Sequence, residues 1–175
     1  MTALEVYDLT TKGGGTDFAR VIEACRSIGP YCLIGGLAVN CFVEPVYTLD
    51  ADLVVVSGRL DELANHLRDS GFTVEIFEHS VNVQASGSQL RIQFTTDSRY
   101  QEFLSRCSER EVLGEQVFVA SLEDVTQGKL WAYSDPRRRL TKRKKDELDL
   151  IRLAEAYPHL QKTYPKDLVD LLSQG

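Results

Sequence analysis

The stretch that decides the fold is YCLIGGLAVNCFVEPVYTLDADLVVV, which runs from Tyr31 to Val56. Its first apolar run ends in two adjacent glycines, Gly35 and Gly36, and a short helical segment follows. A second apolar run then opens with two aspartates, Asp50 and Asp52. Because side chains alternate along a strand, both carboxylates are expected to leave the same face.

These two features suit two parts of one ligand. A glycine at a strand-to-helix turn lets the backbone approach a ligand closely, and the free N–H groups that follow suit phosphate. Two carboxylates side by side repel each other unless a cation lies between them, and their oxygens suit Mg²⁺. Alone, the glycines are also explained by a tight turn and the acids by a polar strand end. Together they predict a site for a nucleoside triphosphate and its metal.

The rest of the chain predicts an α+β fold, with a mixed sheet flanked by helices. Turn signals and hydrophobic periodicity indicate mixed strands and helices first and helices only afterwards. We therefore expect an α/β core over residues 1–120 and a C-terminal helical lobe over 121–175, packed as one compact unit. The expected strands are 31–34, 49–56, 72–78, 81–85, 89–95 and 117–120. The expected helices are 17–27, 37–42, 59–70, 100–106, 141–157 and 165–173. A further helix is expected to begin at the capping box SLED, at Ser121.

Composition places the chain among ordinary globular proteins. Of its 175 residues, 43% are hydrophobic and 26% are charged, and no apolar run is long enough to cross a membrane. The four cysteines form no CxxC pair, which predicts reduced thiols in a cytoplasmic protein. The net charge is −6, yet seven of the nine residues from Arg137 to Lys145 are basic. This run is either a solvated helix end or a local positive field for an anionic ligand.

Three blocks of sequence resemble a known family. The segments GGLAVN and DAD, then VFVASLEDVTQGKLWA and finally KRKKDELDLIRL, occur in the order found in the polymerase-β-type nucleotidyltransferase superfamily. Within it, the chain is most similar to the small bacterial members grouped with AbiEii-type toxins and minimal nucleotidyltransferases. The resemblance covers residues 31–153.

The resemblance implies Mg²⁺- or Mn²⁺-dependent transfer of a nucleoside monophosphate from a nucleoside triphosphate to a protein or RNA acceptor. It implies that Asp50 and Asp52 hold the metal and act in catalysis together with Lys129 and Asp146. Lys129 is otherwise a surface lysine, and Asp146 and Asp149 otherwise pair with basic neighbours along their own helix. The residues implied to bind the nucleotide are Gly35, Gly36, Asn40, Lys129 and Lys145.

One position departs from the family pattern. The family carries a third acid on a later strand, within the pattern Arg-apolar-Asp-apolar, and the matching stretch here is LRIQF, with Gln93 in place of the acid. Glutamine offers a neutral carbonyl oxygen and no negative charge. Asp97, Glu75 or Glu78 are the acids near enough in sequence to substitute.

Three functions follow from these observations. The first is a working nucleotidyltransferase, impaired or not by Gln93. The second is a catalytically inactive protein that binds nucleotide or RNA, and the third is an interaction protein of the toxin–antitoxin type with a small partner protein. For the first two, we expect Gly36, Asp50, Asp52 and Lys129 to line one cleft, with part of the basic run at its rim.

Overall fold

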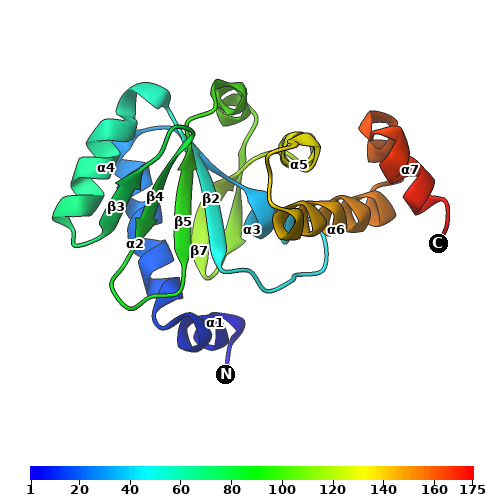
Figure 1. The fold of residues 1–175 in the computed structure, drawn as a ribbon. Helices are drawn as coiled ribbons and strands as arrows, with labels where there is room; N and C mark the ends of the chain where they lie inside the picture. The colour runs from blue at the N-terminus through cyan, green and yellow to red at the C-terminus, as the bar shows by residue number, and fades with distance from the viewer.

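The computed structural model describes all residues from 1 to 175. Seven strands form one mixed sheet in the order β3-β4-β5-β2-β1-β7-β6, with helices on both faces (Figure 1). The elements in chain order are α1 (Ala3–Thr11), α2 (Gly14–Ile28), β1 (Tyr31–Ile34), α3 (Gly35–Val39), β2 (Asp50–Val55), η1 (Ser57–Arg59), α4 (Leu60–Asp69), β3 (Thr73–Ile76), β4 (Ser80–Gln84), β5 (Arg91–Thr95), η2 (Ser98–Ser105), β6 (Ser108–Val112), β7 (Glu115–Val119), α5 (Leu122–Ser134), α6 (Leu140–Ala156), η3 (Pro158–Thr163) and α7 (Lys166–Leu172).

The strand pairings explain why the sheet is mixed. Strand β2 lies in the middle, antiparallel to β1 and parallel to β5. Strand β1 in turn runs parallel to β7, while the β3–β4, β4–β5 and β6–β7 pairs are antiparallel. The predicted fold class, a mixed sheet flanked by helices, is confirmed.

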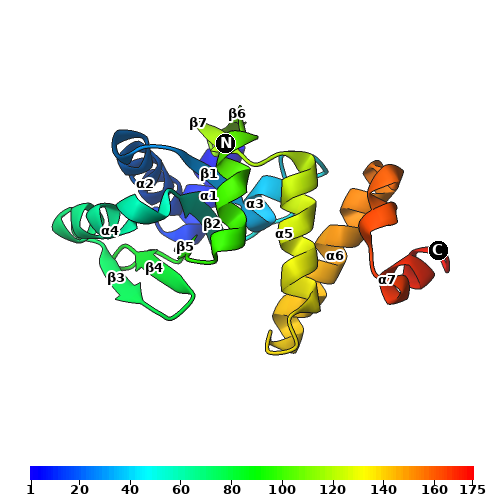
Figure 2. The ribbon, with the colours of Figure 1, turned by 90° about the horizontal axis from the view of Figure 1, so that it is seen from above.

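The helices form two layers around the sheet. Helices α2 and α4 lie on one face, and α3, α5 and α6 lie on the other (Figure 2). The buried apolar side chains form one continuous cluster that includes Leu150 and Leu153 of α6 as well as the strands. Helix α7 lies at the far end of α6, and the predicted boundary at residue 120 falls between β7 and α5.

Helix α1 and strand β6 were absent from the sequence prediction, as were the short 3₁₀ helices η1 and η3. Helix α1 begins at a complete capping box, in which the Thr2 hydroxyl accepts from the Glu5 N–H and the Glu5 carboxylate accepts from the Thr2 N–H. This signal is readable in the sequence. Strand β6 is four-fifths exposed and highly charged, so it has no apolar alternation to reveal it.

The capping box predicted at SLED is half present. The Ser121 hydroxyl accepts from the Asp124 N–H at 3.1 Å, as an N-cap should. The Asp124 side chain does not return the bond, because it pairs with Arg106 of the loop after η2. Helix α5 therefore starts where the sequence predicted. None of the helices is long and apolar enough to span a membrane.

Candidate active site

Asp50 and Asp52 lie at the start of β2 with their side chains on one face of the sheet. Ala51 between them is fully buried on the other face. Both carboxylates line a cavity of about 300 Å³, which we call cavity A, and Gly36 and Lys129 line it too. The four residues expected to share a cleft therefore line one cavity.

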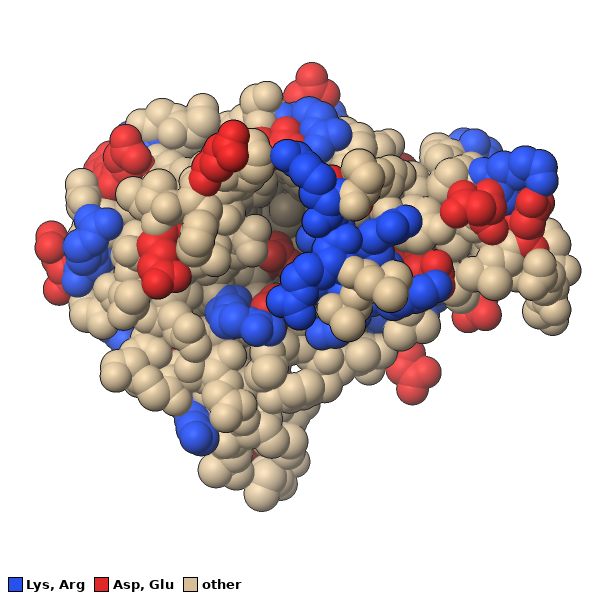
Figure 3. All heavy atoms as spheres, viewed as in Figure 1, with Lys and Arg blue, Asp and Glu red and all other residues tan.

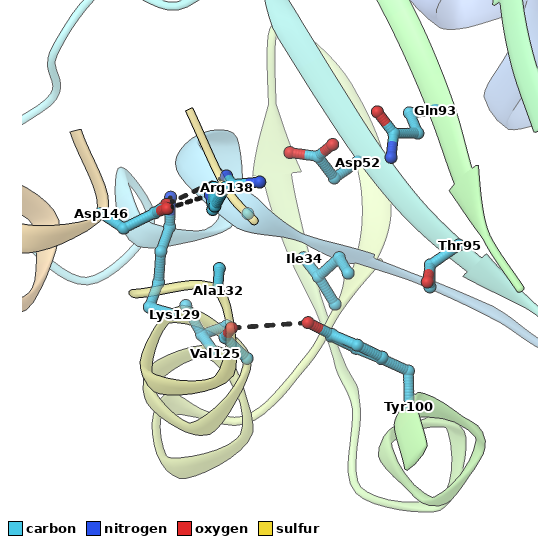
Figure 4. A pocket seen from close by; sticks show the side chains of 12 residues that line it. Ile34, Asp52, Gln93, Thr95, Tyr100, Val125, Lys129, Ala132, Arg138 and Asp146 are labelled. Atoms are coloured by element: carbon cyan, nitrogen blue, oxygen red, sulfur yellow. Dashed lines mark hydrogen bonds and ion pairs between the residues drawn. The ribbon is translucent and has the colours of Figure 1, made fainter. Parts of the chain in front are cut away.

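Two further cavities continue from cavity A. Cavity B, of about 120 Å³, shares Asp52 and Gln93 with cavity A (Figure 4). Cavity C, of about 710 Å³, shares Thr95 and Tyr100 with cavity B. Arg138 lines all three. The three cavities thus adjoin as one cleft, and Figure 3 shows the hollow with Lys and Arg side chains gathered along one side.

Gly35 brings the backbone against Asp52 where β1 turns into α3. Its φ is +70°, a conformation that favours glycine. A Cβ on Gly35 would lie 2.1 Å from Oδ2 of Asp52, whereas a Cβ on Gly36 would meet nothing closer than 3.7 Å. The close approach therefore needs glycine at the first of the two positions.

Asp50 is held between two cations from distant parts of the chain. Arg91 Nε of β5 donates to its Oδ1 at 2.8 Å, and Lys142 Nζ of α6 donates to its Oδ2 at 2.6 Å. Partial burial raises the pKa of Asp50, but the hydrogen bond and charge of Lys142, aided by Arg91, hold that pKa below its ordinary value. Asp50 is ionised at neutral pH.

Asp52 has no hydrogen-bond donor and no ion pair in the structure. Burial raises its pKa above the ordinary value, Lys129 opposes the rise, and the neighbouring charge of Asp50 adds to it. A half-buried carboxylate without a partner is costly, because a buried charge is normally paired or coordinates a metal. Its free oxygens face cavities A and B.

Gln93 lies directly beside Asp52, because β5 runs parallel to β2 with these two residues in register. The next residue in that row is Asn82 of β4, and Glu75 of β3 follows it. Glu75 is thus two strand spacings, about 10 Å, from Gln93. No group of three acids, histidines or cysteines capable of holding a metal exists in the structure.

The other acids proposed as substitutes are also placed elsewhere. Asp97 lines cavity C, where Arg99 donates to both of its carboxylate oxygens. Glu78 lies in the turn between β3 and β4, with its carboxylate 3.7 Å from Nε2 of His79. None of the three acids takes the place of the missing carboxylate.

Lys129 and Asp146 form a buried ion-pair network at the inner wall of the cleft. Lys129 Nζ lies 3.0 Å from Asp146 Oδ1 and 2.7 Å from Asp149 Oδ2. Burial lowers the pKa of Lys129, but Asp149 and Asp146 outweigh it and raise that pKa above its ordinary value. Arg138 binds the second oxygen of Asp146, and Arg152 binds Asp149. Both Lys129 and Asp146 line the cleft, and both are already paired.

Asn40 and Lys145 lie in cavity A with different freedom. The Asn40 side chain accepts from the Val46 N–H at 3.0 Å and donates to the Val46 carbonyl at 2.7 Å, so it holds the loop before β2. Lys145 is exposed, and no ion pair or hydrogen bond involves its amine. Of these two, Lys145 is the one free to meet a ligand.

Three cations of the site were not individually expected. Lys142 and Arg138 belong to the basic run, which was expected at the rim only as a group. Arg91 was missed, although the pattern Arg-Ile-Gln repeats the spacing of Asp-Ala-Asp on a neighbouring strand. The parallel register that puts Arg91 beside Asp50 could not be read from the sequence.

The donor set at β2 fits one divalent cation. Two carboxylates on one face, one of them unpaired, are the hard oxygen ligands that Mg²⁺ accepts alongside water and phosphate. The fit requires Lys142 to leave Oδ2 of Asp50. Gln93 adds a neutral amide, so the residues present resemble a site for one ion more than a site for two.

Comparisons with known proteins rest on structure. No protein-family model and no curated protein matches the sequence. The crystal structure of ANT(2″)-Ia in complex with adenylyl-2″-tobramycin is similar over 90% of this chain and 93% of that chain, with a TM-score of 0.56 and 17% identity. The solution structure of this antibiotic-resistance factor gives a TM-score of 0.53 at 17% identity, over 90% of each chain. The chain has a nucleotidyltransferase fold.

A second solved protein supports this assignment. The antigenic nucleotidyltransferase-like protein from Paracoccidioides brasiliensis is similar over 91% of each chain, with a TM-score of 0.54 and 20% identity. At these identities the likeness extends to the nucleotidyltransferase fold and no further. The narrower resemblance to AbiEii-type toxins stays a prediction.

Proposed function

We propose that this protein transfers a nucleoside monophosphate from a nucleoside triphosphate to an acceptor, in a reaction that depends on Mg²⁺ or Mn²⁺. The observation that carries the proposal is the unpaired carboxylate of Asp52, which lies beside Asp50 and against Gly35 in the cleft. In a nucleotidyltransferase fold, this arrangement favours binding of a metal and a nucleotide, which an isolated pair of acids would not indicate.

The chain's own residues divide the work. Asp50 and Asp52 would hold the metal, which supplies charge neutralisation at the phosphates. The backbone at Gly35 and Gly36 would approach the triphosphate, since no Cβ stands in the way. Lys145, being unpaired and exposed, would bind a phosphate oxygen as a point charge.

Lys142 would change partners when the nucleotide binds. In the free protein its amine pairs with Asp50, at 2.6 Å from Oδ2. With a cation held by Asp50 and Asp52, Lys142 would be released from that carboxylate and would bind a phosphate in the same cavity. Lys129, Asp146 and Asp149 would keep α5 and α6 fixed to form the wall.

The test is transfer from α-labelled nucleoside triphosphates in Mg²⁺ or Mn²⁺, with protein and RNA fractions as acceptors. We expect label transfer by the wild type and its loss in Asp50→Ala and Asp52→Ala. Asp61→Ala is the matched control, because this exposed aspartate on α4 lies outside the cleft. Equal transfer by the Asp50→Ala protein would remove the proposal.

Gln93 favours a second candidate, a protein that binds nucleotide without turning it over. A glutamine beside Asp52 leaves Asp50 and Asp52 as the only strand carboxylates that line cavity A, and Asp146 and Asp149 of α6 are already paired. Calorimetry should then show binding of the nucleoside triphosphate while the transfer assay stays blank, and Gln93→Asp should restore turnover. Turnover by the wild type would exclude this candidate.

A further inference from the structure

Gln93 stands on β5 at the position where the family resemblance implies a third acid. It is exposed to the cleft, it lines cavities A and B, and it lies in register with Asp52. A hydroxyl that attacks a phosphorus must give up its proton, and a carboxylate at this position would accept it. The amide of glutamine has no basic site at neutral pH.

No other acid in the cleft is free to replace it. Apart from Asp52, which faces the proposed metal, every carboxylate that lines the three cavities has a cationic partner. The pairs are Asp50 with Arg91 and Lys142, Asp97 with Arg99, Asp135 with Arg137, Asp146 with Lys129 and Arg138, and Asp149 with Lys129 and Arg152. His79 lines only cavity C, away from Asp52, and is mostly exposed beside Glu78.

The remaining polar groups near Gln93 are hydrogen-bond donors. Thr95 and Tyr100 line cavity B, and the Tyr100 hydroxyl donates to the Gly128 carbonyl at 3.4 Å. Burial raises the pKa of Tyr100 to about 12, so its phenol keeps its proton at neutral pH. The neutral Gln93 amide can donate as well. Apart from Asp52 and the paired Asp146, cavity B thus offers hydrogen-bond donors to an acceptor group and no base.

The excess positive charge of the cleft lies along its rim, whereas the cations and carboxylates that line cavities B and C are equal in number. Arg138 lines both cavities and Arg99 and Arg137 line cavity C, and each would have to share its carboxylate partner with a bound anion. Figure 3 shows Lys and Arg side chains gathered along one edge of the hollow. A focused positive edge attracts a phosphate and repels a polycationic acceptor. Guanidinium groups also match phosphate oxygens two at a time.

We infer that the acceptor of this nucleotidyltransferase presents an ionised phosphate monoester to the nucleotide in place of a hydroxyl. The inference rests on the proposed function and names the chemistry of its acceptor. A phosphate monoester carries about −1.5 to −2 charges at pH 7, so its attacking oxygen has no proton to lose. Gln93 and Thr95 would donate to its other oxygens, as would Tyr100 on leaving the Gly128 carbonyl, and the body of the acceptor would extend into cavity C.

The proposed step balances without a base. A phosphate oxygen of the acceptor forms a bond to the α-phosphorus of the nucleoside triphosphate. The bond from that phosphorus to the bridging oxygen of the β-phosphate breaks, and its electron pair leaves with pyrophosphate. The product is a nucleoside monophosphate joined to the acceptor through a diphosphate linkage, and no proton is transferred.

The experiment compares acceptors that differ only in the phosphate. We would offer glycerol 3-phosphate against glycerol, and a 5′-phosphorylated against a 5′-hydroxyl hexaribonucleotide with its 3′ end blocked, each with α-labelled nucleoside triphosphates and Mg²⁺. Label should enter at least one phosphorylated compound as a phosphatase-resistant diphosphate and neither hydroxyl counterpart. The two phosphorylated arms distinguish a small molecule from an RNA end.

Variants separate the inference from a folding defect. Gln93→Asp should lower transfer to the phosphorylated acceptor by at least about tenfold, because like charges at close range repel. The same variant should gain transfer to the hydroxyl compound. Gln116→Asp, the same change at an exposed position on β7, should alter neither activity.

Failure of the inference looks different from failure of the proposed function. Wild-type transfer to a hydroxyl compound and not to its phosphorylated partner would overturn the inference and leave the proposed function standing. Bound nucleotide without transfer to either phosphorylated compound would also overturn it. A chain that binds no nucleoside triphosphate at all would overturn both.

Discussion

Substituting alanine at Gly35 tests the geometry on which the site depends. The new Cβ would lie 2.1 Å from Oδ2 of Asp52 and 2.9 Å from both Cβ and Cγ of that residue. Rotating the carboxylate away does not relieve the contact, because the Asp52 Cβ is part of the clash and its position is set by the backbone. The strand pair β1–β2, in which Ile34 and Asp52 are partners, would therefore have to separate.

The expected cost has two parts. An alanine held at φ +70° costs about 1–2 kcal/mol, and forced overpacking adds about 1–3 kcal/mol. For a domain of this length, a combined loss of at least about 2 kcal/mol lowers the melting temperature by about 4 °C or more. The displaced Asp52 should also weaken Mn²⁺ binding by the folded variant.

Two controls isolate these parts. Gly87→Ala has nearly the same φ, +79°, and no atom within 4 Å of the new Cβ, so it should show only the backbone cost. Gly36→Ala meets atoms no closer than 3.7 Å and should change stability least. Thermal unfolding and Mn²⁺ titration of the three variants provide the comparison. If Gly35→Ala melts and binds Mn²⁺ like Gly87→Ala, the proposed close approach of Gly35 to Asp52 is wrong.

Three further predictions concern charge. Asp146→Asn removes the buried carboxylate that pairs with Lys129 and Arg138, and should lower the free energy of unfolding in urea titrations by about 3–5 kcal/mol. A loss below about 1 kcal/mol would contradict the pairing. Asp52→Asn should stabilise the metal-free protein at pH 7.5. The raised carboxyl pKa makes the folded state bind more protons than the unfolded chain, so the stability of the wild type falls as pH rises from the ordinary pKa through the raised one. The stability gained by the variant should therefore vanish at lower pH, and an equal gain at every pH would refute this cause. Lys142→Met should free Asp50 for Mn²⁺, so that Mn²⁺ binds the free protein more tightly while the nucleoside triphosphate binds more weakly. Lys144→Met, which removes an exposed ion pair with Glu147, should change neither affinity.

Most regular elements could be predicted from local patterns. The strands β1 and β2 are short apolar runs with clear ends, and α4 has its apolar residues at helical spacing. Segment 100–106 was predicted as a helix and forms the 3₁₀ helix η2, which shares the local polar and apolar pattern but differs in its hydrogen bonds. Strand β6 was not predicted, because a charged edge strand is stabilised by pairing with its partner, here β7 across a turn, and not by an apolar pattern of its own.

The sequence by itself determined that Asp50 and Asp52 share a face and that a glycine turn precedes them, since both follow from alternation and from the freedom of glycine. Only the tertiary structure decided what those carboxylates meet. The parallel register of β2 and β5 brings Arg91 to Asp50 and Gln93 to Asp52, and the packing of α6 brings in Lys142 from 92 residues away. Strand pairing and helix packing depend on how the whole core closes, so no local stretch of the chain contains that information.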